Sequence, residues 1–152
     1  MIGRHGILMV RVTLKLPKHF PFSTDIPVRI SDINYNNHLG HDSIITLIHE
    51  ARVRFLNAYG FTELDIDGFG LVMTDLVVIY KAEVFYGEVL TIEVTIQDFT
   101  KHGFDFVYRI INKATGTEVA RAKTGVLIFD YGTRKVVAVP KSFRSAMVTN
   151  AQ

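Results

Sequence analysis

A single helical pattern followed only by strand patterns is the feature that most limits what this chain can fold into. Apolar residues recur at helical spacing through residues 42–59, and those expected on one face are Ile44, Leu47, Ile48, Ala51, Phe55 and Ala58. Asp42 or Ser43 is expected to cap the first turn, and Gly60 follows the last turn, as glycine commonly does. The chain is therefore expected to contain one long helix.

Alternating apolar and polar residues predict strands on both sides of this helix. The expected strands are residues 23–30 before the helix and residues 71–81, 88–98, 103–112, 118–129 and 136–139 after it. Pro27 lacks a backbone N–H, which favours an edge position or a late start for the first strand. Residues 11–16 alternate more briefly and are expected to form a short edge strand or a lead-in.

This order of elements predicts the fold class. Consecutive strands joined by short turns pair antiparallel, and one helix cannot cover both faces of such a sheet. We therefore expect an α+β fold in which a curved antiparallel sheet of about five strands wraps around one long central helix. A second subunit is expected to cover the other face or an edge of the sheet.

The composition fits one globular domain and excludes several classes of protein. The 152 residues are expected to form a single domain, with a core at about 22–139 and a C-terminal tail at 140–152. The absence of cysteine excludes a disulfide framework, a zinc–thiolate site and a cysteine nucleophile. No basic run points to nucleic acid, and no apolar run is long enough for a membrane span. We expect a cytoplasmic protein without a secretory signal.

A polar stretch, Ser31 to His41, separates the first strand from the helix. A helix N-terminus carries unpaired backbone N–H groups and the positive end of the helix dipole. Polar side chains crowded at such an end, without a glycine-rich phosphate pattern, are typical of a site that holds a carbonyl group or a water. Turn formation and capping are the structural alternative for the same residues.

Three motifs, in this order and at this spacing, resemble those of hotdog-fold thioesterases of the 4-hydroxybenzoyl-CoA thioesterase-like group. In that group the first strand ends in a pattern like S-D-x-D-x-x-x-H-x-N-N, a helix carrying E-A-R follows, and Y-x-x-P-x-x-x-G-D-x-L leads into a later strand. The matching segments here are Ser31 to His41, Glu50-Ala51-Arg52 and Tyr80 to Leu90. The resemblance covers residues 24–130 and implies a single hotdog domain.

Two departures from the family pattern bear on the chemistry. The usual catalytic aspartate falls on Asn34, whose amide stays neutral and cannot act as a base or a nucleophile. The paired asparagines before the helix are replaced by Gly40 and His41. The plant acyl-carrier-protein thioesterases, a second branch, use an Asp, Asn, His and Glu set. Its last three members fall on Asn36, His38 and Glu83, while its Asp again falls on Asn34.

The resemblance implies hydrolysis of an acyl-CoA or acyl-carrier-protein thioester by direct attack of water, without a cofactor. His38 or Glu83 would supply the base, and Asn34 and Asn36 would hold the water or the thioester carbonyl. Backbone N–H groups near the helix N-terminus would stabilise the oxyanion, and the residues concerned are Gly40, His41 and Asp42. No metal is expected, because His49 and His102 have no ligand spacing with another histidine.

Three further acidic residues are candidates for supporting roles. Asp32 is expected to hold the polar loop through bonds from its side chain to the backbone. Glu50 lies on the helix, where other hotdog branches place a carboxylate, but an ion pair with Arg54 explains it equally well. Asp75 interrupts an apolar strand and is expected either to line the site or to contact a second subunit.

Two other functions compete with hydrolysis. A non-catalytic module that binds acyl thioesters is favoured by Asn34. A hotdog dehydratase or hydratase resembles D-x-N-P-x-H, whereas here Asp32 and His38 are six apart and Tyr35 replaces the proline. The resemblance also implies a homodimer or homotetramer, in which residues 71–83 would face the helix N-terminus of the next chain.

Overall fold

The computed structural model describes residues 11–150 and confirms the predicted fold class. The elements in chain order are β1 (Phe22–Pro27), a 3-10 turn η1 (Ile30–Asp32), α1 (His41–Ala58), β2 (Gly70–Tyr80), β3 (Val89–Gln97), β4 (Gly103–Asn112), β5 (Glu118–Asp130), β6 (Lys135–Val136) and α2 (Lys141–Asn150). Each of the four strands expected at 71–129 ends within one residue of its predicted bounds. Among the described residues, no helix has the length and apolarity that a bilayer span requires.

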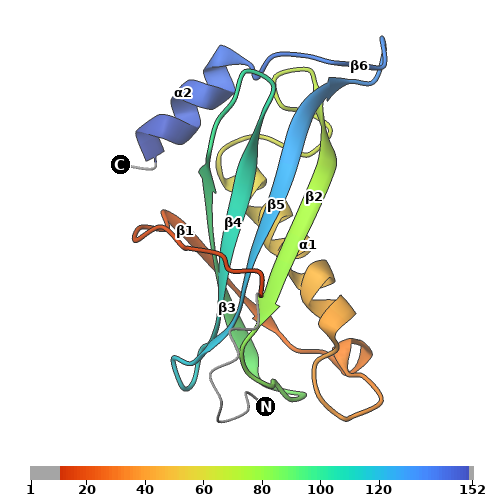
Figure 1. The fold of residues 1–152 in the computed structure, drawn as a ribbon, viewed down its shortest axis with the longest axis vertical. Helices are drawn as coiled ribbons and strands as arrows, with labels where there is room; N and C mark the ends of the chain where they lie inside the picture. The colour runs from red at the N-terminus through yellow and green to blue at the C-terminus, as the bar shows by residue number, and fades with distance from the viewer. Residues whose placement is uncertain (1–10, 151–152) are drawn as a thin grey trace.

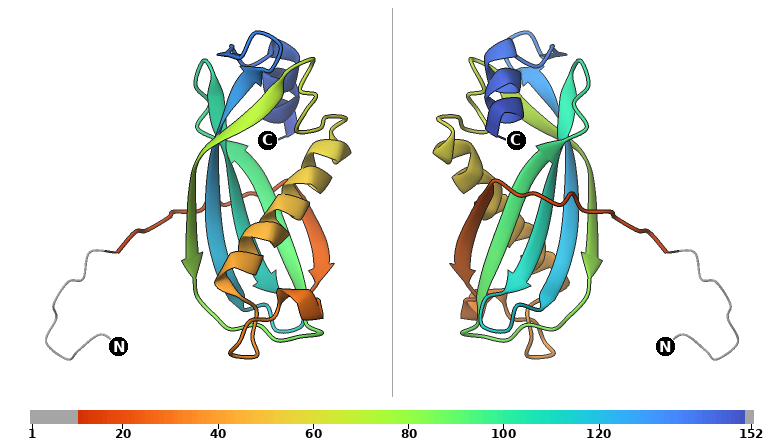
Figure 2. Two further views of the ribbon diagram at one scale, coloured as in Figure 1. Left: turned by 90° about the vertical axis from the view of Figure 1, so that its right-hand side faces the viewer. Right: turned by 90° about the vertical axis from the view of Figure 1, so that its left-hand side faces the viewer.

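The sheet is antiparallel throughout and curves around α1 (Figures 1 and 2). Its strand order is β1-β3-β4-β5-β2, and β6 pairs with the end of β5. β1 is an edge strand, as Pro27 predicts, and Pro27 is its last residue. β2 is the long strand at the opposite edge, so its outer row of backbone N–H and C=O groups has no strand partner among the described residues.

The core lies between α1 and the concave face of the sheet. The helix buries five of the six residues predicted for its apolar face, including Leu47, Ala51 and Phe55, which are at most 2% exposed. The prediction is wrong for Ala58, which lies in the last turn and is exposed. Phe55 packs edge-on against Phe22 of β1 and Phe106 of β4. Burial of each large apolar side chain contributes about 1.5–3 kcal/mol, so this face is what fixes α1 across the sheet.

The start of α1 differs from the sequence prediction. The helix begins at His41, and Gly40 is its N-cap without any side-chain hydrogen bond, so the expected cap by Asp42 or Ser43 is wrong. A Cβ at position 40 would lie 2.6 Å from Asp42 Oδ1 and 3.4 Å from Asn34 Cβ. A larger residue at position 40 would therefore need the Asp42 side chain to move, so glycine lets the polar loop approach the helix closely. At the other end Gly60 adopts a φ of +83°, as predicted for the residue that ends a helix.

Both ends of the described chain pack on the domain. Residues 141–150 form helix α2 where the sequence analysis expected a tail, and Phe143 and Met147 of this helix are buried in the core. At the N-terminal side, residues 11–16 form no strand, and the extended chain crosses the face of the sheet opposite α1 (Figure 1). Arg121 of β5 holds it by donating to Leu14 O at 2.8 Å.

Candidate active site

A cavity of about 480 Å³ lies where the polar loop, the N-terminus of α1 and the end of β2 meet. It brings together five of the residues singled out from the sequence: Asn34, Asn36, His38, His41 and Glu83. The backbone joins the two segments directly, because Leu39 N–H donates to Val84 O at 2.7 Å. The predicted site residues from the loop and from the segment after β2 therefore share one cavity.

The side chain of Asn34 both shapes the loop and faces the cavity. Its Oδ1 accepts the backbone N–H of Asn36 at 2.9 Å, and its backbone N–H donates to His38 O at 2.8 Å. Asn37, in the same turn, has a φ of +64°, a conformation that asparagine tolerates. Because Oδ1 is bonded to an N–H group, the amide nitrogen points away from the loop. Position 34 thus offers hydrogen-bond donors where an aspartate would offer a second acceptor.

His38 is half-buried and held by one hydrogen bond. Its Nδ1 lies 3.1 Å from Leu39 O. A carbonyl oxygen can only accept, so Nδ1 carries the proton and Nε2 of the neutral ring keeps its lone pair. Glu83 lines the same cavity and is exposed, and no hydrogen bond joins it to His38 in the described structure. His38 Nε2 is therefore an unpaired acceptor at the cavity.

The helix N-terminus supplies donors to the same place. The backbone N–H groups of His41 and Asp42 have no hydrogen-bond acceptor within residues 11–150. The N–H of Gly40 differs from the expectation, because it donates to Asp32 O at 3.0 Å and is not free. Gly40 contributes the close approach described above, and the free donors are those of His41 and Asp42.

Tyr80 is a site residue that the sequence analysis did not single out. Its hydroxyl donates to His41 O at 2.6 Å, so the last residue of β2 fastens the first turn of α1. Burial, with a smaller contribution from the negative charge of Asp42, raises the pKa of this hydroxyl. The signal available in the sequence was its place at the start of the Tyr80 to Leu90 motif.

The three acidic residues considered for supporting roles lie outside this cavity. Asp32 is buried and accepts the backbone N–H of Arg29 at 2.8 Å, with the Arg29 guanidinium on both carboxylate oxygens. Asp75 forms an ion pair with Lys123 of the neighbouring strand β5. Within this chain both carboxylates therefore bind the protein itself and do not face the site.

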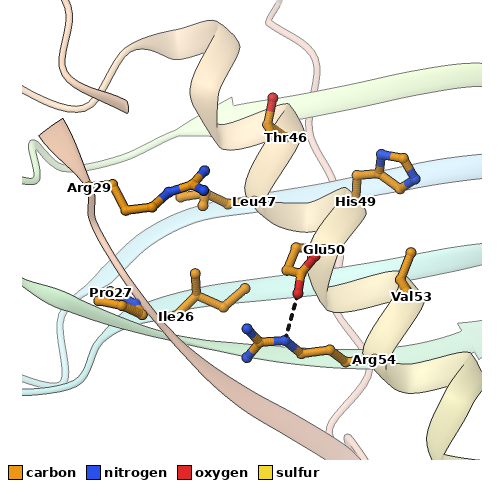
Figure 3. A pocket seen from close by; sticks show the side chains of 9 residues that line it. All are labelled: Ile26, Pro27, Arg29, Thr46, Leu47, His49, Glu50, Val53 and Arg54. Atoms are coloured by element: carbon orange, nitrogen blue, oxygen red, sulfur yellow. Dashed lines mark hydrogen bonds and ion pairs between the residues drawn. The ribbon is translucent and has the colours of Figure 1, made fainter. Parts of the chain in front are cut away.

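Glu50 lies on a different face of α1, toward β1. It accepts a hydrogen bond from Arg54 Nε at 3.0 Å, and the two residues line a separate cavity of about 400 Å³ (Figure 3). Arg54 in turn donates to Thr24 Oγ1 and Asp25 O, which joins the helix to the edge strand. The structure thus shows the ion pair between Glu50 and Arg54, which was one of the two interpretations of Glu50 from the sequence.

A buried polar network lies further along α1. Arg52 donates to Glu63 Oε1 at 2.6 Å through Nε and to the Tyr108 hydroxyl at 3.2 Å through Nη1. Tyr108 is also bonded to Thr124 Oγ1 at 2.9 Å, and His49 Nε2 lies 3.0 Å from Glu63 Oε2. Burial by itself would raise the pKa of Glu63, but the bonds and charges of Arg52 and His49 outweigh it and leave that pKa lowered. Sequence reasoning missed this network, since its members come from four segments: α1, the segment that follows it, β4 and β5.

In the described part of the chain, no group of three or more histidine and acidic side chains is placed to hold a metal ion. The site offers polar donors and acceptors from the protein alone. These groups can bind a carbonyl oxygen at the helix N-terminus and hold a water beside His38 Nε2.

Comparison with known proteins gives one family and many similar structures. The family model described as the thioesterase-like superfamily matches residues 28–147. Among curated proteins nothing matches. A 1,4-dihydroxy-2-naphthoyl-CoA thioesterase from Synechocystis is 21% identical with a TM-score of 0.77, covering 84% of this chain and 95% of its own.

Two further structures are similar over most of both chains. A hypothetical protein from Staphylococcus aureus, solved in complex with CoA, is 19% identical with a TM-score of 0.78, covering 91% of this chain and 88% of its own. A thioesterase superfamily protein from Jannaschia sp. CCS1 is 19% identical with a TM-score of 0.80, covering 89% and 86%. At these identities the structures establish the shared fold.

Proposed function

The chain belongs to the thioesterase-like superfamily, and from that premise we propose that it hydrolyses an acyl-CoA thioester by direct attack of water. The observation that carries the proposal is the set of unpaired polar groups around one cavity. These are the N–H groups of His41 and Asp42, the amide nitrogen of Asn34 and the Nε2 of His38. CoA is chosen as the carrier because two of the similar structures are described with CoA or a CoA thioester.

The donors suit the oxyanion that forms when water adds to a thioester carbonyl. Backbone N–H groups at a helix N-terminus act together with the helix dipole and need no rearrangement during the reaction. The Asn34 amide adds a side-chain donor next to them, since Gly40 brings the loop and the helix into contact. In this proposal the departure from aspartate turns position 34 from a base into a donor to the carbonyl or the water.

The base is His38 in this proposal. Nε2 takes a proton from the attacking water as its oxygen bonds to the carbonyl carbon. The C–S bond then breaks and the proton passes to the leaving sulfur, which gives CoA thiol and a carboxylic acid, and the acid loses its proton to solvent. Glu83, in the same cavity, is the alternative base, and Asn36 is placed to hold the water.

A second copy of the chain is the proposed partner. β2 is an open edge strand, and its exposed apolar side chains include Met73, Leu76 and Tyr80. A free edge with apolar neighbours favours pairing with another strand, and residues 71–83 are the proposed facing wall. A dimer or tetramer by light scattering supports this arrangement, and a monomer at micromolar concentration contradicts a shared site.

A thiol-release assay tests the function. Acyl-CoAs of several chain lengths are supplied with a thiol reagent, and the same acyl groups on acyl carrier protein are compared. Release from CoA above the uncatalysed rate is the expected result. Binding without release would instead favour the non-catalytic module, for which the missing aspartate at position 34 is the supporting observation. A change in enoyl-CoA absorbance without thiol release would indicate a hydratase.

A further inference from the structure

Three hollows follow one another between α1 and β2, beginning at the candidate active site. The first is lined by His41 and Tyr80, the second, of about 330 Å³, by Ile45 and Leu76, and the third, of about 110 Å³, by Arg52. His41 and Ile45 are one helical turn apart, and Tyr80 and Leu76 lie on one face of β2. The second and third hollows share Arg52 and Met73, and the first lies about one helical turn before the second; this row of hollows is called the α1–β2 groove below.

The walls of this groove are apolar and open to solvent. Ile45, Met73 and Leu76 are 39%, 46% and 38% exposed, and all three line the second hollow. They would suit the hydrocarbon part of an acyl group. They would equally suit contact with a second copy at β2, so the walls alone do not identify an acyl site.

Arg52, at the floor of the groove, distinguishes binding of an acyl group from contact with a second copy. Arg52 is 5% exposed, yet it lines both the second and the third hollow. Its Nε and Nη1 are bonded to Glu63 and Tyr108, whereas Nη2 makes no hydrogen bond within the described residues. Every fully buried polar side-chain atom among these residues has a partner, so Nη2 keeps some contact with solvent, and Arg52 lines the second and third hollows. A buried guanidinium thus presents a free donor at the end of an apolar channel.

We propose that the α1–β2 groove holds the acyl group and that Arg52 Nη2 donates to an oxygen at its far end. The substrate class is then acyl thioesters that carry a terminal hydroxyl or carbonyl oxygen. Glu63 already neutralises Arg52, so a neutral oxygen fits better than a carboxylate. His49, the other titratable group on the rim, is itself bonded to Glu63. This assignment rests on the thioesterase function proposed above.

The length of the groove sets the size of the acyl group. Arg52 is eleven residues beyond His41, which is about 16 Å along a helix. Helical side chains lean toward the N-terminus, so the guanidinium lies nearer to the site than its Cα does. A medium-length acyl chain would span this distance. A methyl-ended chain would cover the N–H groups of Nη2 without replacing their bonds to water, which weakens transition-state binding about 5- to 100-fold.

Pairs of acyl-CoAs that differ only at the far end test the proposal. Short, medium and long ω-hydroxyacyl-CoAs are compared with methyl-ended chains of equal length, and kcat/KM is measured for each. A preference for the hydroxyl of about 5- to 100-fold, confined to one range of lengths, is expected. Equal values at every length would overturn the assignment while leaving thioester hydrolysis in place.

Two variants and one control test whether Arg52 and the groove cause the preference for a terminal hydroxyl. Arg52→Met keeps the volume and removes the donors, so the hydroxyl-to-methyl ratio should fall to about one. Arg109→Met, which breaks an ion pair with Glu93 away from the groove, should leave the ratio unchanged. Ile45→Phe narrows the groove without touching the network, so longer chains should lose kcat/KM relative to short ones, even if Arg52→Met does not fold.

A binding measurement separates this proposal from the function on which it rests. Non-hydrolysable thioether analogues of the same pairs are titrated calorimetrically. Tighter binding of the hydroxyl-ended analogue without turnover of the thioester would support the groove and contradict hydrolysis. Equal binding of both analogues together with turnover would contradict the groove alone.

Discussion

The polar groups at the two ends of the α1–β2 groove differ in their hydrogen-bond pairing. Around Arg52 the guanidinium, a carboxylate and two hydroxyls are bonded to one another inside the domain. Around His38 the ring nitrogen Nε2 and the amide nitrogen of Asn34 have no partner among the described residues, and both side chains line the cavity. Unpaired groups are what a reaction can use, and paired groups are what hold a structure together.

This contrast predicts a separation of effects along one helix. Substitutions at the His38 end should change turnover and leave the free energy of unfolding nearly unchanged. Substitutions at the Arg52 end should lower stability first. The experiments below test that separation, beginning with the largest expected effect.

His38→Ala should give the largest loss of activity. Removing a general base costs about 10²- to 10⁴-fold in kcat, whereas the one hydrogen bond of His38, to Leu39 O, contributes about 1 kcal/mol to stability. Thiol release and thermal unfolding of the same sample measure both quantities. His19→Ala, at an exposed position before β1, is the matched control. Unchanged turnover would remove His38 as the base, and Glu83→Gln would then be the variant to lose activity.

Asn34→Asp tests the donor assigned to the loop. One carboxylate oxygen can still accept the Asn36 N–H, so the turn is retained, but the amide donor is replaced by a negative charge. Loss of an oxyanion donor costs about 10²- to 10³-fold in kcat, with KM changing less. An increase in kcat would show that this position acts better as a base, and that the site works as in the family pattern with aspartate.

Glu63→Gln tests the other end of the comparison. It removes the charge that faces Arg52, and a lowering of stability by about 1–3 kcal/mol at neutral pH is expected. Because the folded-state pKa of Glu63 is lowered, its stabilisation is complete above the unfolded value near 4.5 and is lost as the pH falls through the folded value. The gap in melting temperature between wild type and variant should therefore close in acid.

The exposed Glu50 provides the control for Glu63. Its pair with Arg54 is half-exposed, so Glu50→Gln should change stability by less than about 1 kcal/mol. A Glu63→Gln protein as stable as this control would mean that the network around Arg52 does not hold the helix. The division between the two ends of the groove would then fail.

Helices and strands were predictable where a single periodic pattern of apolar residues determines them. The apolar face of α1 and the alternation in β3 and β4 arise from burial on one side, which the sequence displays directly. The helix α2 was missed although Phe143 and Met147 are spaced i, i+4, because one turn of apolar spacing between polar residues is a weak signal. Its burial depends on Phe61 and Phe104, which come from distant parts of the chain.

The candidate site was predictable only in part, and for a related reason. The loop residues are close in sequence, so the motif identified Asn34, Asn36 and His38 together. Contacts between distant segments were not visible: Arg52 meets Tyr108 only through the packing of α1 on β4, and Tyr80 meets His41 across the groove. A motif names residues, whereas pairing depends on register and packing.

Tyr80→Phe should give the smallest effect. It tests a hydrogen-bonded side chain that lies at the His38 end of the groove. Its hydroxyl is bonded to His41 O at 2.6 Å, so it positions the helix turn whose N–H groups face the cavity that Tyr80 also lines. Loss of one such bond is worth about 1 kcal/mol, or about 5-fold in kcat if the turn shifts, with KM unchanged. Tyr86→Phe, an exposed tyrosine beyond the same strand, is the control. A Tyr80→Phe protein with lower stability and full kcat would place Tyr80 with the paired, structural groups.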